Sequence, residues 1–227
     1  MWNNLEKGFQ IAFGKAWEAY KNHTIPIGVA IMDKNDMIMA TGQNQIYTDG
    51  DGIIKHHQLA HAEINAILKL SEIKDPNIHK QIRGYTLYTT MEPCPLCFGA
   101  IVMGSIRNIK FAARDNYGGA TALNQSIEYI KNKGISVLGH FEELEIVQIA
   151  IQVCYELEKN DSVYIQSNFR DEVLLPSWTQ SCEKGVEIGK YLFKNKVLQN
   201  MISHDFNDVY EYIIGRYSGF HTKPLQL

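Results

Sequence analysis

Segments of strand character alternate with segments of helical character from residue 5 to residue 158, and this alternation restricts the class of fold. Apolar residues at every third or fourth position mark the helices, and short β-branched or aromatic runs mark the strands. In chain order we expect a helix at 5–20, strands at 28–33 and 37–41, a helix at 60–71, a strand at 85–89, a helix at 93–103, strands at 106–113 and 136–139, and a helix at 142–158. This order favours an α/β fold, a layered sheet with helices on its faces.

The pattern changes after about Asn160. Residues 161–178 show no sustained period, and two apolar groups further on indicate helices: Val186, Leu192, Val197 and Met201, then Val209, Tyr212 and Ile213. We therefore predict two parts, residues 1–159 and a C-terminal extension of residues 160–227. The extension is expected to be mainly helical and to pack on the first part.

The charge balance argues against a surface built for polyanions. The formal net charge is −3, and residues 151–227 carry 8 Lys and Arg against 10 Asp and Glu. A general nucleic-acid-binding face is thereby disfavoured, although a local basic patch is not. The chain has no uninterrupted run of about 18 apolar residues, and its first ten residues lack a signal peptide's apolar stretch. We expect a cytoplasmic protein without a membrane partner.

Four cysteines are present, of which Cys94 and Cys97 stand three positions apart while Cys154 and Cys182 stand alone. In a reducing compartment this spacing indicates a metal or redox pair and two buried thiols, not a disulfide framework. Cys94 and Cys97 open a predicted helix, where both thiolates lie on one side of a turn and can reach one ion. The helix N-terminus also favours the thiolate form.

A second motif, His61-Ala62-Glu63, opens another predicted helix. His61 can supply a third ligand, and three protein ligands leave the fourth tetrahedral position open, as in catalytic zinc sites. Glu63 is poorly placed to ligate as well, but it can take a proton from an activated water and return it to a substrate. Two alternatives are weaker: a redox pair, which leaves His61 and Glu63 unexplained, and a structural zinc site with His56, His57 or His79 as fourth ligand.

His-x-Glu followed by Pro-Cys-x-x-Cys is the signature of zinc-dependent base deaminases. The chain carries both parts, in His61-Ala62-Glu63 and Pro93-Cys94-Pro95-Leu96-Cys97. Further segments fit in the same order: residues 25–30, 42–44, 60–67, 87–92 and 99–101. Over roughly residues 5–158 the sequence thus resembles the cytidine and deoxycytidylate deaminase family, and it looks closest to the branch of guanine deaminases and tRNA adenosine deaminases. The histidine ligand disfavours the small tetrameric cytidine deaminases, and the short cysteine gap disfavours the riboflavin-pathway deaminases.

The resemblance implies a three-layer cytidine-deaminase-like fold, with a five-stranded mixed sheet flanked by helices. It also implies Zn2+ on His61, Cys94 and Cys97, with Glu63 as the proton shuttle of a hydrolytic deamination that releases ammonia. By the same resemblance the Ala62 backbone N–H and the Asn44 side chain face the substrate, and the Pro93 carbonyl lies near the leaving amino group. For Asn44 the alternative without the family is a loop-capping residue.

The sequence constrains the type of reaction more closely than it constrains the substrate. Asp115 follows a predicted strand and could read the exocyclic amino group of guanine, although a plain turn aspartate is the commoner use of such a residue. Three aromatic residues could stack on a base: Tyr47, Phe98 and Tyr117. We favour a small-molecule substrate, a purine-type base, nucleoside or nucleotide that is guanine-like or adenine-like. The alternatives are a tRNA adenosine deaminase acting on an anticodon loop and a catalytically silent subunit, which the intact Glu63 disfavours. A homodimer is the expected assembly.

Overall fold

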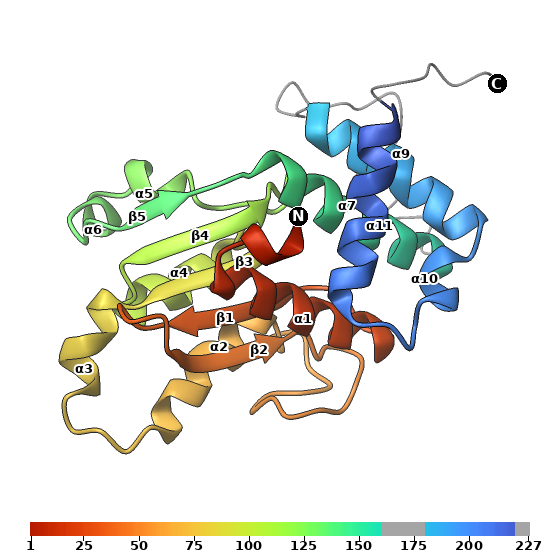
Figure 1. The fold of residues 1–227 in the computed structure, drawn as a ribbon. Helices are drawn as coiled ribbons and strands as arrows, with labels where there is room; N and C mark the ends of the chain where they lie inside the picture. The colour runs from red at the N-terminus through yellow and green to blue at the C-terminus, as the bar shows by residue number, and fades with distance from the viewer. Residues whose placement is uncertain (160–179, 221–227) are drawn as a thin grey trace.

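A mixed sheet of five strands forms the centre of the computed structural model, which describes residues 1–159 and 180–220 (Figure 1). The strands are β1 (Gly28–Met32), β2 (Ile38–Gln43), β3 (Thr86–Met91), β4 (Asn108–Ala113) and β5 (Ser136–Leu138), in the order β2-β1-β3-β4-β5. β1 runs antiparallel to β2 and β3, whereas β3, β4 and β5 are parallel to one another. The predicted α/β class and five-stranded mixed sheet are confirmed.

Helices cover both faces of the sheet because the central strands are apolar on both sides. Successive side chains of a strand point to opposite faces. Val29 and Ile31 of β1 join a core cluster with residues of α2 (Ala62–Lys69) and α4 (Pro95–Met103). The alternate residues Ala30 and Met32 join a second cluster with α1 (Lys7–Lys21) and α7 (Glu142–Glu158). The result is the three-layer arrangement that the alternating sequence favoured.

Short elements join these layers, and all except η2 (Leu70–Glu72) were not predicted. They are the helices α3 (Ile78–Gln81), α5 (Leu123–Ser126) and α6 (Glu128–Lys131) and the 3-10 turns η1 (Trp2–Asn4), η2 (Leu70–Glu72) and η3 (Ile82–Gly84). Each has only three or four residues, so it has no periodicity to detect. The helix expected at 60–71 is α2 followed by η2.

Beyond residue 179 the chain forms α9 (Gln180–Lys194), α10 (Val197–Asn200) and α11 (Phe206–Phe220), which lie beside α7 (Figure 1). A left-handed residue, Lys196 with φ 52°, separates α9 from α10. The two apolar groups of the sequence thus fall on three helices. The segment 161–178, which shows no sustained period in the sequence, lies entirely outside the described residues. The division at residue 159 stays a prediction.

Glycines allow α9 to approach α7 closely. A Cβ atom on Gly185 would lie 2.6 Å from the Cβ of Ile149, and one on Gly189 would lie 2.7 Å from the Ala150 carbonyl oxygen. Real Cβ atoms do not come this near, so a larger residue at either position would push the helices apart. The small residues at this contact therefore set the spacing of α9 and α7.

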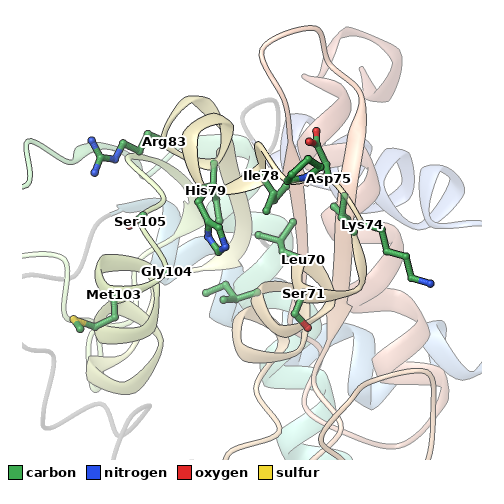
Figure 2. A pocket seen from close by; sticks show the side chains of 14 residues that line it. Leu70, Ser71, Lys74, Asp75, Ile78, His79, Arg83, Met103, Gly104 and Ser105 are labelled. Carbon is green, nitrogen blue, oxygen red and sulfur yellow. The ribbon is translucent and has the colours of Figure 1, made fainter.

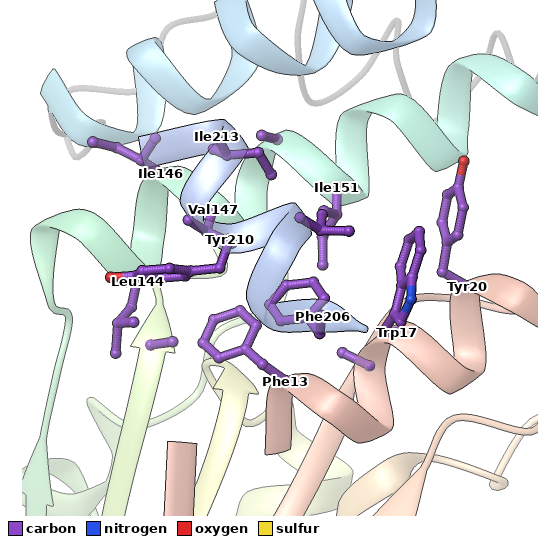
Figure 3. Close-up of a cluster of buried hydrophobic side chains, with 14 of the residues drawn as sticks. Phe13, Trp17, Tyr20, Leu144, Ile146, Val147, Ile151, Phe206, Tyr210 and Ile213 are labelled. Atoms are coloured by element: carbon purple, nitrogen blue, oxygen red, sulfur yellow. The ribbon is translucent and has the colours of Figure 1, made fainter. Parts of the chain in front are cut away.

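The helix α11 enters the core beside α1 and α7. Figure 3 shows Phe206, Tyr210 and Ile213 of α11 among side chains of α1 and α7. The rings of Phe13 and Phe206 stack at 5.3 Å between centroids. The helices after residue 179 therefore share one continuous apolar core with the sheet. Within the described residues no helix is both long and apolar enough to cross a membrane.

Candidate metal centre and substrate cavity

The N-termini of α2 and α4 meet at one point, and each begins at a residue with metal-binding capacity. His61 is the N-cap of α2, and Cys94 is the N-cap of α4 with Pro95 in the first helical position. Proline is favoured there because its fixed φ suits a helix start and its missing N–H is not needed. Cys97 follows within the first turn of α4, so the two helix starts bring three ligand residues together.

The three ligand atoms have the spacing of a zinc site. The Nδ1 atom of His61 lies 3.4 Å from the Cys97 Sγ and 3.7 Å from the Cys94 Sγ, and all three atoms lie within 4.8 Å of one another. Tetrahedral zinc with ordinary bond lengths places nitrogen and sulfur ligands about 3.6 Å apart. The donor set of one imidazole and two thiols also suits zinc. The predicted Zn2+ therefore fits this group.

The polar contacts in the group already favour thiolate. The pKa of Cys94 falls to about 4, mainly because the Cys97 thiol donates a hydrogen bond to it, with the His61 ring adding to the effect. The same contact, together with burial, raises the pKa of Cys97. The hydrogen bond to Cys94 also raises the pKa of His61. Cysteine binds a metal as the thiolate, so a bound cation would release the proton that these contacts hold on Cys97.

The other histidines considered as ligands lie elsewhere. The exposed His56 has its Nε2 atom 3.3 Å from an oxygen of Asp49, and the exposed His57 accepts a hydrogen bond from the Leu59 N–H. His79 lines a different cavity (Figure 2). None of the three joins the metal group. The described residues therefore offer no histidine as a fourth ligand there.

Glu63 lies beside the metal group and inside the protein. Its side chain is only 4% exposed, and the Cys97 Sγ lies 3.3 Å from its Oε2. The Thr89 hydroxyl, 3.2 Å from Oε1, holds the other oxygen. Burial raises the pKa of Glu63, so this carboxyl takes up a proton more readily than an exposed one. It combines proton affinity with proximity to the three ligands.

A cavity of about 490 Å³ opens next to His61. It is lined by residues of both layers of helices and of the strand ends: Ile25, Ile27, Tyr47, His61, Met91, Asp115, Gln152, Tyr155, Glu156 and Lys159. Its size and its mixture of apolar, aromatic and polar walls are typical of small-molecule sites. Tyr47 and Asp115 were singled out in the sequence, whereas the four residues of and next to α7 were missed. The signal available was Gln148, Gln152 and Glu156 at spacings of four within the mainly apolar stretch 146–157.

Asp115 lies in a tight turn and also borders the cavity. One of its carboxylate oxygens, Oδ1, accepts hydrogen bonds from the backbone N–H groups of Tyr117 and Gly118 at 3.0 and 2.8 Å. Burial raises the pKa of Asp115. Asp115 therefore holds the turn and also lines the cavity, while its contact with a substrate amino group stays a prediction.

Asn44 is buried and its amide orientation is defined by its partners. Its Oδ1 accepts hydrogen bonds from the Thr24 hydroxyl at 2.8 Å and from the Ile46 N–H at 3.1 Å. The backbone donor at Ile46 requires an oxygen at that position. The Nδ2 group is thus what this residue can still offer a ligand, not both a donor and an acceptor.

The remaining predicted contacts lie at the helix starts. Ala62 is the first residue of α2, where backbone N–H groups have no partner within the helix. Pro93 precedes the Cys94 N-cap, and its carbonyl accepts a hydrogen bond from the Ala120 N–H at 3.0 Å. A carbonyl oxygen has a second lone pair, so it can still accept from a ligand. Of the aromatic candidates, Tyr47 lines the cavity, Tyr117 is exposed, and Phe98 is fully buried in the core below α4.

The loop after β4 is held by groups that sequence reasoning missed. The carboxylate of Glu92 accepts hydrogen bonds from the Thr121 N–H at 3.2 Å and from the Thr121 hydroxyl. The loop also contacts α9, because the Asn116 Nδ2 lies 3.5 Å from the sulfur of Cys182 on that helix. The segment that carries Asp115 is therefore fixed both to the cysteine motif and to α9.

A larger cavity of about 810 Å³ lies at the opposite ends of α2 and α4, where Leu70, Met103 and Ser105 border it (Figure 2). The nine residues of α4 span about 13 Å. None of the metal-group residues lines this cavity. Its volume alone does not make it the reaction site.

Comparison with known proteins agrees with this geometry. Residues 2–113 match the family model described as the cytidine and deoxycytidylate deaminase zinc-binding region. A cytosine deaminase of Candida albicans is 29% identical over 114 residues, which are 50% of this chain and 69% of that protein. A guanine deaminase of Bacillus subtilis is 33% identical over 104 residues, which are 46% of this chain and 60% of that protein.

A solved structure from studies of tRNA:A34 deaminases is 25% identical and superposes with a TM-score of 0.50, covering 63% of this chain and 96% of that one. These relatives are named for different substrates: cytosine, guanine and a tRNA adenosine. The chain therefore belongs to the cytidine and deoxycytidylate deaminase family.

Proposed function

We propose that the chain is a zinc-dependent hydrolytic deaminase that converts an amino group of a nucleobase, nucleoside or nucleotide to a carbonyl and releases ammonia. The observation that carries this proposal is the buried Glu63 carboxyl, 3.3 Å from a thiol of a group with zinc spacing. Family membership supports the reaction class. A carboxyl with a raised pKa next to an open coordination position is the arrangement that a proton shuttle needs.

Zinc, when bound to His61, Cys94 and Cys97, supplies an activated water as the nucleophile. Glu63 takes the proton from that water, delivers it to a ring nitrogen and then assists the departure of ammonia. The Thr89 hydroxyl orients the carboxyl for these transfers. The Asn44 Nδ2 and the Ala62 N–H donate to the base, and the Pro93 carbonyl accepts from the leaving amino group. Water enters and ammonia leaves, so the atoms balance.

A small purine-type substrate remains the favoured choice within the family. Among the described residues, two carboxylates, Asp115 and Glu156, line the cavity together with one basic side chain, Lys159. This balance disfavours ligands rich in phosphate. The likeness to the tRNA:A34 deaminase structure favours the second candidate, an enzyme acting on an anticodon loop.

Three basic residues close together in the sequence are the candidates for a local basic patch near the site: Arg107, Lys110 and Arg114. Arg107 precedes β4, whose six residues span about 20 Å, and its Nη1 donates to the Ile106 carbonyl. Lys110 forms an ion pair with Glu6 at 2.6 Å. Of the three, only Arg114 follows the end of β4 nearest the cavity, which weakens the case for an extended RNA contact.

An ammonia-release screen tests the function. The purified protein, with its zinc content measured, is assayed against nucleobases, nucleosides, nucleotides and a tRNA anticodon stem-loop. We expect ammonia from at least one small substrate and little from the stem-loop. Release from none of them by zinc-loaded protein would refute the proposal. The homodimer, the cytoplasmic location and the division into residues 1–159 and 160–227 stay proposals alongside it.

A further inference from the structure

One wall of the cavity contains a buried acceptor without a partner. The side chain of Gln152 on α7 is only 3% exposed and lines the cavity next to the metal group. Among the residues that the structure describes, its Oε1 atom has no hydrogen-bond partner. Leaving a buried polar atom unsatisfied costs about 1–3 kcal/mol, so such an atom in a residue that lines a cavity points to a ligand contact.

The chemical nature of this atom is determined by its neighbour. The Nε2 group of Gln152 donates to the Oε1 of Glu156 at 2.7 Å. A carboxylate only accepts hydrogen bonds, so the amide nitrogen must face it and the amide oxygen must face the other way. With its nitrogen held by Glu156, the group that Gln152 can still offer a ligand is therefore an acceptor, which requires an N–H or O–H donor.

The position of Gln152 in the fold indicates which side of a bound base this residue contacts. His61 reaches the cavity from α2, and Gln152 reaches it from α7, which lies on the opposite face of the sheet. A base whose reacting amino group faces the metal group thus turns its far side toward α7. In cytosine, adenine and guanine, the ring nitrogen that carries the sugar in nucleosides lies on the side remote from the reacting carbon. In a free base this nitrogen carries hydrogen.

We propose that Gln152 is a specificity-determining residue whose Oε1 accepts a hydrogen bond from this ring N–H, so that the substrate is a free nucleobase. The inference rests on the proposed deaminase function and narrows its substrate class. A nucleoside or nucleotide carries a sugar in place of the hydrogen and leaves Oε1 buried without a donor. The family-model match ends at residue 113, so Gln152 belongs to a part of the chain outside the shared zinc-binding region.

The chain offers a matched control on the same helix. Gln148 lies one turn earlier on α7, is fully buried, and also has an Oε1 atom without a partner in the described part of the chain. Its Nε2 donates to the Pro26 carbonyl at 2.9 Å, and its side chain does not line the cavity. Gln148 and Gln152 thus share residue type, helix and burial, and differ in access to the cavity.

The test compares each free base with its methylated form. Guanine and 9-methylguanine, adenine and 9-methyladenine, and cytosine and 1-methylcytosine are titrated calorimetrically into zinc-loaded full-length protein. A Glu63→Ala background prevents consumption of the base. Three proteins are used: this background alone, with Gln152→Met, and with Gln148→Met. Methionine keeps the length and volume of glutamine and removes the acceptor.

We expect at least one free base to bind about 10- to 100-fold more tightly than its methylated form in the background protein. This ratio should fall to within about threefold with Gln152→Met and persist with Gln148→Met. A ratio that survives Gln152→Met reflects the bulk of the methyl group and overturns the proposal, as does failure of every free base to bind. If Gln152→Met does not fold, Gln152→Asn is the substitute variant, because its side chain is one methylene shorter and withdraws the oxygen. It is expected to lose the preference for the free base in the same way.

Ammonia release is measured in parallel with protein that retains Glu63. Absence of ammonia with the binding pattern intact refutes the proposed function and leaves the Gln152 contact standing. Ammonia release with no preference for the N–H form refutes the Gln152 contact and leaves the proposed function standing.

Discussion

The Nδ1 atom of His61 lies 3.4 Å from the Sγ atom of Cys97, although 36 positions separate these residues in the chain. One residue caps α2 and the other lies in the first turn of α4, so the contact joins two helix starts on one face of the sheet. A metal bound here therefore acts on the fold as well as on the reaction, and the two effects can be tested separately.

Replacing Cys97 with alanine should abolish stoichiometric zinc binding and lower the thermal stability of the protein. Metal-binding energy contributes to folding when the ligands come from separate elements. Elemental analysis and melting curves with and without chelator measure both effects, and a chelator should reproduce the destabilisation in the wild type. Cys154→Ala is the control, because Cys154 is equally buried but lies in the α1–α7 core. Full zinc content in Cys97→Ala would contradict the assignment.

Glu63→Ala should retain zinc and fold but lose most turnover. The carboxyl is expected to act on protons and not to ligate the metal, and general acid–base groups typically contribute about 10²- to 10⁴-fold. Zinc content and ammonia release are measured on the same preparation. Activity within about threefold of the wild type would show that another group carries the protons.

Gly189→Val should destabilise the protein by about 1–3 kcal/mol, because a side chain there meets the Ala150 carbonyl and Val153 of α7 at less than 3 Å. Gly14→Ala on α1 is the control. Its Cβ would have nothing within 4 Å, and alanine is the better helix former, so this change should be neutral or stabilising. Denaturant unfolding of both variants gives the comparison. Equal stability of Gly189→Val and the wild type would show that α9 does not depend on this contact.

Turnover of a free base should depend weakly on salt, whereas any conversion of an anticodon stem-loop should fall steeply. Each phosphate contact releases counterions and adds to the salt slope. Rates for both substrates at low and moderate ionic strength provide the measurement. Efficient, strongly salt-sensitive conversion of the stem-loop without any small-molecule turnover would establish the tRNA enzyme instead.

Much of this architecture follows from local sequence. The strands and the long helices could be predicted because each carries a periodic apolar pattern, which depends only on the geometry of its own element. The metal group could be predicted because Cys94 and Cys97 are neighbours on a single turn. His61 and Glu63 likewise belong to one helix start. The short helices α3, α5 and α6 could not be predicted, because a segment of four residues is too short to show a periodic apolar pattern.

What the sequence by itself determined is therefore the α/β layering and the three residues of the metal group, whereas Glu63 as the proton carrier stays a prediction. Only the tertiary structure decided which side chains share the cavity. Gln152 and Glu156 reach it from α7, on the opposite face of the sheet from His61, and Asn44 is limited to a donor by its contacts with Thr24 and Ile46. These relationships join residues that are far apart in the chain. A local periodic pattern in the sequence does not show which faces of two distant helices meet around one cavity.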